Sequence, residues 1–225
     1  TILNSVTLNS VSNDGNKPII TANNENYTFD AVLYATGRRP NTTNIGLENT
    51  DITTNERGAI VVNDTCESSV PGVYAVGDVN GGPQFTYISL DDFRIVFGAL
   101  TGNGHYTLKD RKNIPYTTFL TPPLARVGFT EEEAINNGYT VKTKEMLVAT
   151  MPRAHVNDNL KGAFKIVVDA ESNLILGATL YSQSAEELIN IIKVAMDNNI
   201  PYTYFKNQIF THPTMAENLN DLCNF

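Results

Sequence analysis

Two short apolar runs, each ended by a glycine, constrain the fold of this chain more than any other feature. The first run covers residues 30–36 and is followed by Gly37–Arg38, and the second covers residues 73–76 and is followed by Gly77–Asp78. Continuous apolar runs of this length are typical of strands that are buried on both faces of a parallel α/β sheet. Ligands of such sheets bind beyond the carboxyl ends of the strands. We therefore expect a cofactor near these two glycine-polar pairs.

The segments around these runs complete an α/β first half. Alternating apolar residues between Val6 and Phe29, separated by Asn and Gly clusters, predict a small antiparallel meander. Helical periodicity predicts a helix from about Ile88 to Leu100. The polar stretch from Lys109 to Pro115 predicts a connector, and we place a domain boundary there because the composition changes after it.

The second half mixes strand and helix signals in the way that an α+β domain does. Its predicted elements are, in order, a strand at 117–119, a helix opened by a capping box of Thr130 and Glu133, a hairpin of strands 163–168 and 174–181, a helix opened by a capping box of Ser184 and Glu187 and ending near Asn198, and a last helix with Pro213 at its first position. The helix after Ser184 is broadly apolar, because Ile191 and Val194 widen its apolar stripe. Such a helix needs a cover, which is either the sheet or a second subunit.

Composition and charge exclude several classes of protein. Twenty-four acidic and sixteen basic residues give a formal charge of −8, which disfavours nucleic acid and anionic membranes as partners. No stretch approaches the roughly 20 apolar residues that span a bilayer. Cys66 and Cys223 lie far apart without Cys-x-x-Cys spacing, which predicts reduced thiols in a cytoplasm and no metal site. The start at Thr1, without methionine, predicts a piece of a longer protein.

Each glycine-polar pair has an ordinary and a functional interpretation. Residues 35–40 form either a simple turn after a strand, or a turn in which Gly37 lets a nucleotide approach the backbone while Arg38 meets a phosphate or a ribose. Asp78 either caps a helix or forms an Asx turn, or it accepts hydrogen bonds from sugar hydroxyls. The two pairs in this order, about 40 residues apart, favour the functional interpretation.

The third motif is Thr211-His-Pro-Thr-Met-Ala-Glu217. Residues five apart on one continuous helix point about 140° away from each other, so His212 and Glu217 would not meet there. If Pro213 is the first helical residue, His212 lies before the helix and its ring can turn back towards Glu217. A carboxylate that orients an imidazole suits the ring to accept and donate protons. The alternative is a capping histidine beside a solvated acid.

Together these motifs resemble the FAD- and NAD(P)-dependent pyridine nucleotide-disulfide oxidoreductases over essentially the whole chain. The resemblance implies that residues 1–45 end an NAD(P)-binding domain, that residues 46–112 belong to an FAD-binding domain, and that residues 113–225 form an α+β dimerisation domain. The first two segments would be remnants of three-layer ββα domains. The resemblance also implies a homodimer with FAD and NAD(P)H as cofactors.

The resemblance assigns roles to single residues as well. Gly37–Arg38 would lie beside the nicotinamide dinucleotide, and Asp78, after Gly77, would bind the ribityl chain of FAD. Phe85–Thr86 stand where the family places a backbone N–H against the pyrimidine edge of the flavin. A helix start there would favour negative charge on the reduced flavin. His212, assisted by Glu217, would act as acid and base for the thiols of the opposite subunit.

A narrower resemblance links residues 77–94, 116–127 and 209–222 to the bacterial reactive-chlorine-resistance oxidoreductases, which are described as copper(II) reductases. A C-terminal cysteine pair like that of mercuric reductases is missing, since only Cys223 stands near the end, and this argues against mercury as substrate. The family's glycine-rich dinucleotide loops and redox cysteine pair are also missing, so the chain alone is expected to be inert. The whole protein is expected to pass electrons to a disulfide, an oxidant or a metal ion such as Cu(II). The alternative is a self-associating dimerisation module with no chemistry of its own.

Overall fold

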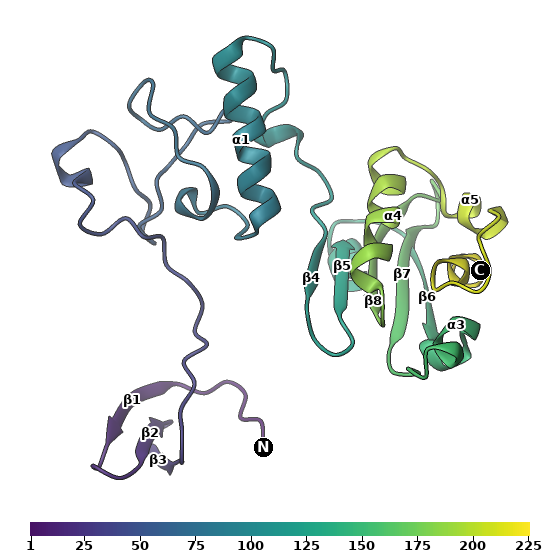
Figure 1. Ribbon diagram of the computed structural model, residues 1–225, viewed down its shortest axis with the longest axis horizontal. Helices are drawn as coiled ribbons and strands as arrows, with labels where there is room; N and C mark the ends of the chain where they lie inside the picture. Colours follow the sequence, from purple (N-terminus) through teal and green to yellow (C-terminus); the bar gives the residue numbers. More distant parts are fainter. The chain divides into compact units, whose positions relative to one another are not determined.

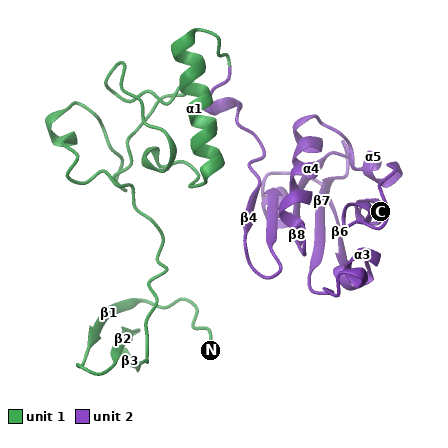
Figure 2. Ribbon diagram, in the orientation of Figure 1, with its two compact units in different colours: residues 1–105 green, residues 106–225 purple.

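The computed structural model describes residues 1–225 and divides into two compact units (Figures 1 and 2). Unit 1 comprises Thr1–His105 and unit 2 comprises Tyr106–Phe225. Both units combine helices with an antiparallel sheet, in keeping with the predicted mixture of α/β and α+β structure. No helix in either unit is both long enough and apolar enough to cross a membrane.

A three-stranded antiparallel sheet opens unit 1. Its strands are β1 (Leu8–Asn13), β2 (Pro18–Ala22) and β3 (Glu25–Thr28), in the order β1-β2-β3. Asn23 and Asn24 connect β2 to β3 with φ angles of 50° and 64°, which is the left-handed conformation that tight hairpin turns need. The predicted meander is therefore confirmed.

One long helix, α1 (Thr86–Thr101), is the main element in the rest of unit 1. It includes the predicted helical residues and ends at Gly102, whose φ of 69° is typical of the residue after a helix. Its buried side chains are Ile88, Asp92 and Ile95. Two short 3-10 helices precede it, η1 (Leu47–Asn49) and η2 (Gly77–Asn80).

Neither apolar run forms the predicted parallel strand. Residues 30–36 contain no strand, and Leu33 and Tyr34 are 90% and 66% exposed. In the second run, Tyr74 forms only an isolated bridge to Glu67. A strand that is buried on both faces needs neighbouring strands on both sides for its backbone N–H and C=O groups. This chain supplies none beside residues 30–36 and only the short segment 66–68 beside the second run. The prediction of two parallel strands is therefore wrong for this chain.

Unit 2 is built on a five-stranded antiparallel sheet in the order β4-β5-β8-β7-β6. The strands are β4 (Tyr116–Thr118), β5 (Leu124–Gly128), β6 (Val141–Leu147), β7 (Ala163–Asp169) and β8 (Ile175–Tyr181). Strands β7 and β8 form the predicted hairpin, in which Phe164 lies opposite Leu180. The strand predicted at 117–119 is β4, shifted by one residue towards the N-terminus.

Helices connect these strands and close the end of the chain. The α-helices are α2 (Glu131–Asn136), α3 (Pro152–Val156), α4 (Ala185–Asp197), α5 (Tyr202–Asn207) and α6 (Leu219–Leu222), and the 3-10 helices are η3 (Leu108–Asp110), η4 (Val148–Thr150) and η5 (Ala216–Asn218). Helix α2 opens with the predicted capping box, because Thr130 and Glu133 each accept the backbone N–H of the other. The hydrogen bond from the Thr130 N–H is the main reason that the pKa of the Glu133 carboxyl lies below its usual value.

Two predicted helix starts differ in the structure. Ser184 precedes α4 with a φ of 65° and makes no side-chain capping bond, so the second predicted capping box is wrong. A capping side chain needs an extended backbone, which this left-handed residue lacks. Pro213 does not begin a helix either. Helical structure starts only at Ala216, because Thr214, the residue after the proline, caps it.

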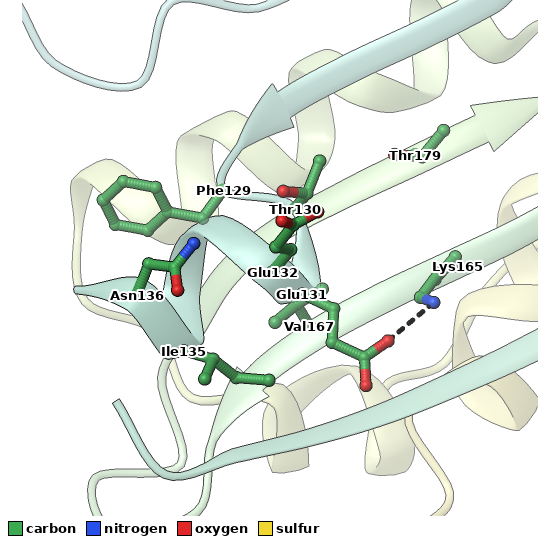
Figure 3. Close-up of a pocket in the computed structure, with 9 residues that line it drawn as sticks. All are labelled: Phe129, Thr130, Glu131, Glu132, Ile135, Asn136, Lys165, Val167 and Thr179. Carbon is green, nitrogen blue, oxygen red and sulfur yellow. Dashed lines mark hydrogen bonds and ion pairs between the residues drawn. The ribbon is translucent and has the colours of Figure 1, made fainter. Parts of the chain in front are cut away.

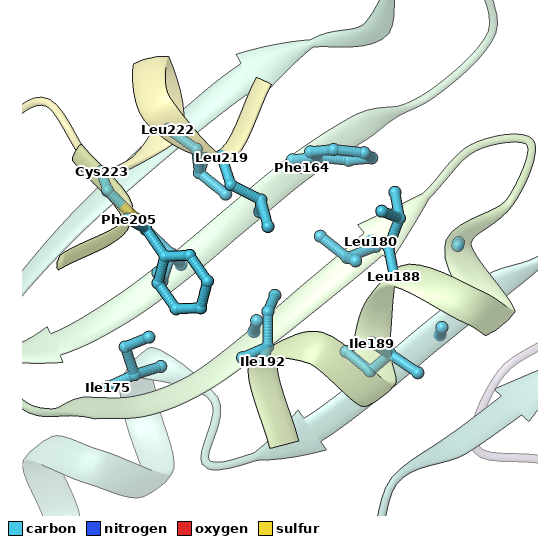
Figure 4. Close-up of a cluster of buried hydrophobic side chains, with 14 of the residues drawn as sticks. Phe164, Ile175, Leu180, Leu188, Ile189, Ile192, Phe205, Leu219, Leu222 and Cys223 are labelled. Carbon is cyan, nitrogen blue, oxygen red and sulfur yellow. The ribbon is translucent and has the colours of Figure 1, made fainter. Parts of the chain in front are cut away.

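The hydrophobic core of unit 2 lies between the sheet and α4 and extends to the C-terminal helices (Figure 4). Its largest buried side chains include Phe164, Ile166, Leu180, Ile189, Ile192, Leu219 and Leu222. The sheet covers one stripe of α4, as expected for an apolar helix. Ile191 and Val194 on the same helix remain 39% and 57% exposed. The chain by itself therefore covers only part of the apolar surface of α4.

Candidate functional site

His212 and Glu217 are in contact where the last helical segment begins. Nδ1 of His212 lies 2.8 Å from Oε2 of Glu217. The contact forms because His212 precedes η5 and its ring turns back over the turn, as predicted for a histidine outside the helix. The His212 side chain is 69% exposed, whereas that of Glu217 is 18% exposed. The structure thus presents the ring to solvent and shelters its carboxylate partner.

Thr214 fixes the carboxylate of Glu217. The backbone N–H of Thr214 donates to Oε1 of Glu217 at 3.2 Å, and the N–H of Glu217 donates to Oγ1 of Thr214 at 3.2 Å. This reciprocal pair is a capping box, and the Thr-x-x-Glu spacing is its sequence signal. With the helix start predicted at Pro213, Thr214 is not identified as the capping residue. One oxygen of Glu217 therefore holds the turn, and the other holds His212.

A carboxylate on Nδ1 leaves the other ring nitrogen of His212 for proton exchange. A carboxylate only accepts hydrogen bonds, so Nδ1 carries the proton in this contact. Nε2 of the neutral ring is then an acceptor, and it becomes a donor once the ring is protonated. The arrangement suits transfer of a proton to or from a group that approaches from solvent.

In unit 1, a buried acid ties the η2 turn to α1. Asp92 is fully buried, and its Oδ2 accepts the N–H of Gly77 at 2.7 Å and the side-chain amide of Asn80 at 2.9 Å. Gly77 has a φ of 72°, and a Cβ at this position would collide with the side chain of Ser89 on α1. These contacts fix the turn against the helix and leave Asp78 exposed.

The start of α1 offers a free backbone donor. No side chain caps this helix, and the N–H of Thr86 donates to no group of the protein. The rings of Phe85 and Tyr87 stack beside it, with centroids 5.0 Å apart and an interplanar angle of 8°. The partial positive charge of a helix start favours an acceptor that carries negative charge. Binding of such an acceptor by Phe85 and Thr86 stays a prediction.

Arg38 lines a hollow of about 690 Å³ in unit 1. Arg39 and Arg57 line the same hollow, together with Gly81 and Gly82, which follow η2. None of the three arginines forms an ion pair. In a chain with a formal charge of −8, three unpaired guanidinium groups around one hollow favour a phosphate or another multivalent anion.

The predicted site residues thus fall into separate groups. Arg38 shares its hollow with the residues that follow η2, but Asp78 itself does not line it. Gly37 has a φ of 96°, a conformation that favours glycine, and it does not line the hollow either. His212 and Glu217 belong to unit 2, whereas all the predicted cofactor residues belong to unit 1.

A second hollow, of about 520 Å³, lies beside α2 and the sheet of unit 2 (Figure 3). Lys165 lines it and donates to Glu131 at 2.8 Å, and it pairs with Glu145 at 3.0 Å. These hydrogen bonds raise the pKa of the Lys165 amine, with the bond to Glu131 as the larger cause. None of the predicted site residues lines this hollow, and the Lys165 amine is already paired with two carboxylates. We therefore assign no chemistry to this hollow.

The two cysteines lie in different units and both are fully buried. Burial raises the pKa of the Cys223 thiol to about 12. A protonated, buried thiol is neither a nucleophile nor a metal ligand. No cluster of three or more His, Cys, Asp or Glu side chains is arranged to hold a metal ion.

Two family models match this chain, and both describe parts of one family. The model of the pyridine nucleotide-disulphide oxidoreductases matches residues 1–92, and the model of their dimerisation domain matches residues 114–223. The chain is 45% identical to the probable pyridine nucleotide-disulfide oxidoreductase RclA of Escherichia coli over 212 residues, which make up 94% of this chain and 48% of RclA. It is 35% identical to a mercuric reductase of Staphylococcus aureus over 190 residues, 84% of this chain and 35% of that protein.

A solved structure agrees with these relatives. The Cu(II) complex of the HOCl-induced flavoprotein disulfide reductase RclA from Escherichia coli matches with a TM-score of 0.93 and 44% identity, over 99% of this chain and 50% of that chain. The chain therefore spans about half the length of RclA and about a third of the length of the mercuric reductase. The predicted fold class and family are confirmed: the chain belongs to the pyridine nucleotide-disulphide oxidoreductase family, and its second half matches that family's dimerisation domain.

Proposed function

We propose that the whole protein is a cytoplasmic, FAD-dependent oxidoreductase that moves electrons from NAD(P)H, through a cysteine pair outside this chain, to a disulfide, an oxidant or a metal ion such as Cu(II). The observation that carries the proposal is the contact between His212 Nδ1 and Glu217 Oε2 on an exposed ring. The names of the relatives support it, because they include a flavoprotein disulfide reductase and a mercuric reductase.

In this proposal, residues of unit 1 would hold the two cofactors. Asp78, which is exposed and follows Gly77, would bind the ribityl chain of FAD. The N–H of Thr86 would donate to the pyrimidine edge of the flavin, and Arg38 would meet the nicotinamide dinucleotide. Bound FAD supplies the two-electron chemistry. In this proposal residues 1–45 end the NAD(P)-binding domain, residues 46–112 belong to the FAD-binding domain and residues 113–225 form the dimerisation domain.

His212 would act as the general base and general acid for the thiols. Glu217 holds the Nδ1–H, so Nε2 is free to accept a proton from a thiol, which leaves a nucleophilic thiolate. The protonated ring would later return that proton to a thiolate leaving group, and Glu217 stabilises its charge meanwhile. In the homodimer these thiols would belong to the opposite subunit, so each active site would be shared by two chains.

The proposal is tested with the full-length protein. We expect the purified protein to be yellow and to oxidise NADH or NADPH when a disulfide, a chlorine-based oxidant or Cu(II) is present, with a turnover of roughly 1–10³ s⁻¹. The absorption spectrum and the loss of nicotinamide absorbance measure the two properties. A colourless protein, or one that oxidises neither nicotinamide cofactor with any of the three acceptors, contradicts the proposal.

A second candidate function is self-association through unit 2 without chemistry of its own. It is favoured by the match of residues 114–223 to a dimerisation domain and by the exposed Ile191 and Val194 on α4. We expect sedimentation of this chain at several concentrations to show a dimer that dissociates on dilution. An Ile191→Asp variant should weaken the dimer, whereas Leu33→Asp, at an exposed position in unit 1, should not. A strict monomer at high micromolar concentration contradicts self-association.

A further inference from the structure

The segment that carries His212 is only partly fixed by packing. Phe210 is partly buried and packs against the hydrophobic core of unit 2, but Ile209 is 94% exposed and the His212 side chain is 69% exposed, so packing anchors only part of residues 209–212. The contact with Glu217 nevertheless needs the ring and the carboxylate within hydrogen-bond reach. Other groups must therefore act together with the packing of Phe210 to fix the course of this segment.

The position of Glu217 is already fixed locally. Its capping box with Thr214 holds one carboxylate oxygen, and the Thr214 hydroxyl donates to the carbonyl of Thr211 at 2.8 Å. These bonds fix the turn after the proline. They do not fix the direction from which the chain arrives at His212.

Asn220 on α6 supplies that restraint. Its side-chain amide donates to the carbonyls of Phe205 at 2.6 Å and Gln208 at 2.9 Å, and also to that of Lys206 at 3.4 Å. These carbonyls lie at the end of α5, where the last C=O groups of a helix have no partner within the helix. One side chain thus ties the end of α5 to the helical segment that follows Glu217.

We propose that Asn220 is a positioning residue for the His212–Glu217 pair. It holds the beginning of segment 208–212, Phe210 packs the middle of the segment against the core, and Thr214 holds its end, so the ring of His212 stays above the Glu217 carboxylate. The importance of this role for catalysis rests on the proposed function of the pair. The effect of Asn220 on the position of His212 does not depend on that function. Asn220 touches neither His212 nor a reacting group, so it acts only through the backbone that it anchors.

The test is ¹⁵N NMR of the imidazole rings in this chain, which contains only three histidines. At alkaline pH, where a histidine ring is neutral, we expect His212 to carry its proton on Nδ1 because Glu217 accepts it. In Asn220→Ala the ratio of the Nδ1–H to the Nε2–H form should fall at least about threefold, a coupling of the size found between neighbouring residues. Thermal unfolding of each variant separates this effect from a general loss of stability.

Asn190→Ala is the matched control. The Asn190 amide donates to the carbonyl of Glu186 at 3.0 Å within α4, so this variant removes the same kind of bond elsewhere in unit 2 and should leave His212 unchanged. A folded Asn220→Ala chain with the wild-type tautomer ratio overturns the inference. If Asn220→Ala does not fold, Asn220→Asp, which keeps the size of the side chain but has no N–H donor, decides between the same two results. A wild-type His212 without a proton on Nδ1 contradicts the proposed function instead, because the pair itself would then be absent.

Discussion

Replacing His212 with glutamine is expected to lower the turnover of the full-length enzyme by about a hundredfold to ten-thousandfold. Glutamine is similar in size, but it cannot exchange a proton near neutral pH. Reduction of the flavin by NAD(P)H does not use the thiols on which His212 would act. We therefore expect rapid-mixing experiments to give an unchanged rate of flavin reduction while steady-state turnover falls.

A second histidine provides the control for this experiment. His155 is also an exposed histidine of unit 2, and its Nε2 lies 2.8 Å from the carbonyl oxygen of Ala149. His155→Gln changes the same chemical group outside the proposed site and should keep full turnover. Wild-type turnover in His212→Gln, or an equal loss in both variants, would remove the acid–base role from His212.

Much of the fold could be predicted where the signal is local. The capping box of α2 and the β7–β8 hairpin depend on residues close in sequence, and both form as expected. The meander of β1–β3 follows from alternation and asparagine turns. Each of these elements finds its hydrogen-bond partners in the same or the next segment of the chain, so the sequence pattern carries the information that its formation needs.

Elements that depend on distant partners could not be predicted from the pattern alone. Residues 30–36 have the composition of a strand buried on both faces, but Leu33 is 90% exposed because no strand of this chain pairs with the run. Composition indicates which structure a segment favours when neighbouring strands are present. It does not indicate whether such strands are present. The predicted capping box at Ser184 is wrong for a different reason. The left-handed backbone of Ser184 prevents the side-chain cap that serine favours.

The candidate site was predicted in part. The contact of His212 with Glu217 was expected because the proline takes the histidine out of the helix, although the helix begins later than Pro213. Asp92 and Arg57 could not be identified in the same way. An acid on a helix and an arginine in a turn are ordinary surface residues in a sequence, and only the tertiary structure buries the first and brings the second to the hollow of Arg38.

The thiol of Cys223 is expected to react about a thousandfold more slowly with iodoacetamide in the folded chain than in the unfolded chain, because burial raises its pKa from 9.0 to about 12 and thiolate is the reactive form. A Cys66→Ala variant isolates this thiol for mass spectrometry. The control is a chain in which both cysteines are alanine and Asn224→Cys places a thiol at the next, exposed position. That thiol should react equally fast in both states.

The same pKa shift gives Cys223 a defined effect on stability. The folded pKa lies above the unfolded value, so the stabilisation is complete below about pH 9 and is lost as the pH rises towards about 12. Between these limits the free energy of unfolding should fall by up to about 1.4 kcal/mol per pH unit more in the wild-type chain than in Cys223→Ala. A redox cysteine must instead be available as a thiolate near neutral pH. Rapid alkylation of folded Cys223 would therefore contradict the proposal that the redox pair lies outside this chain.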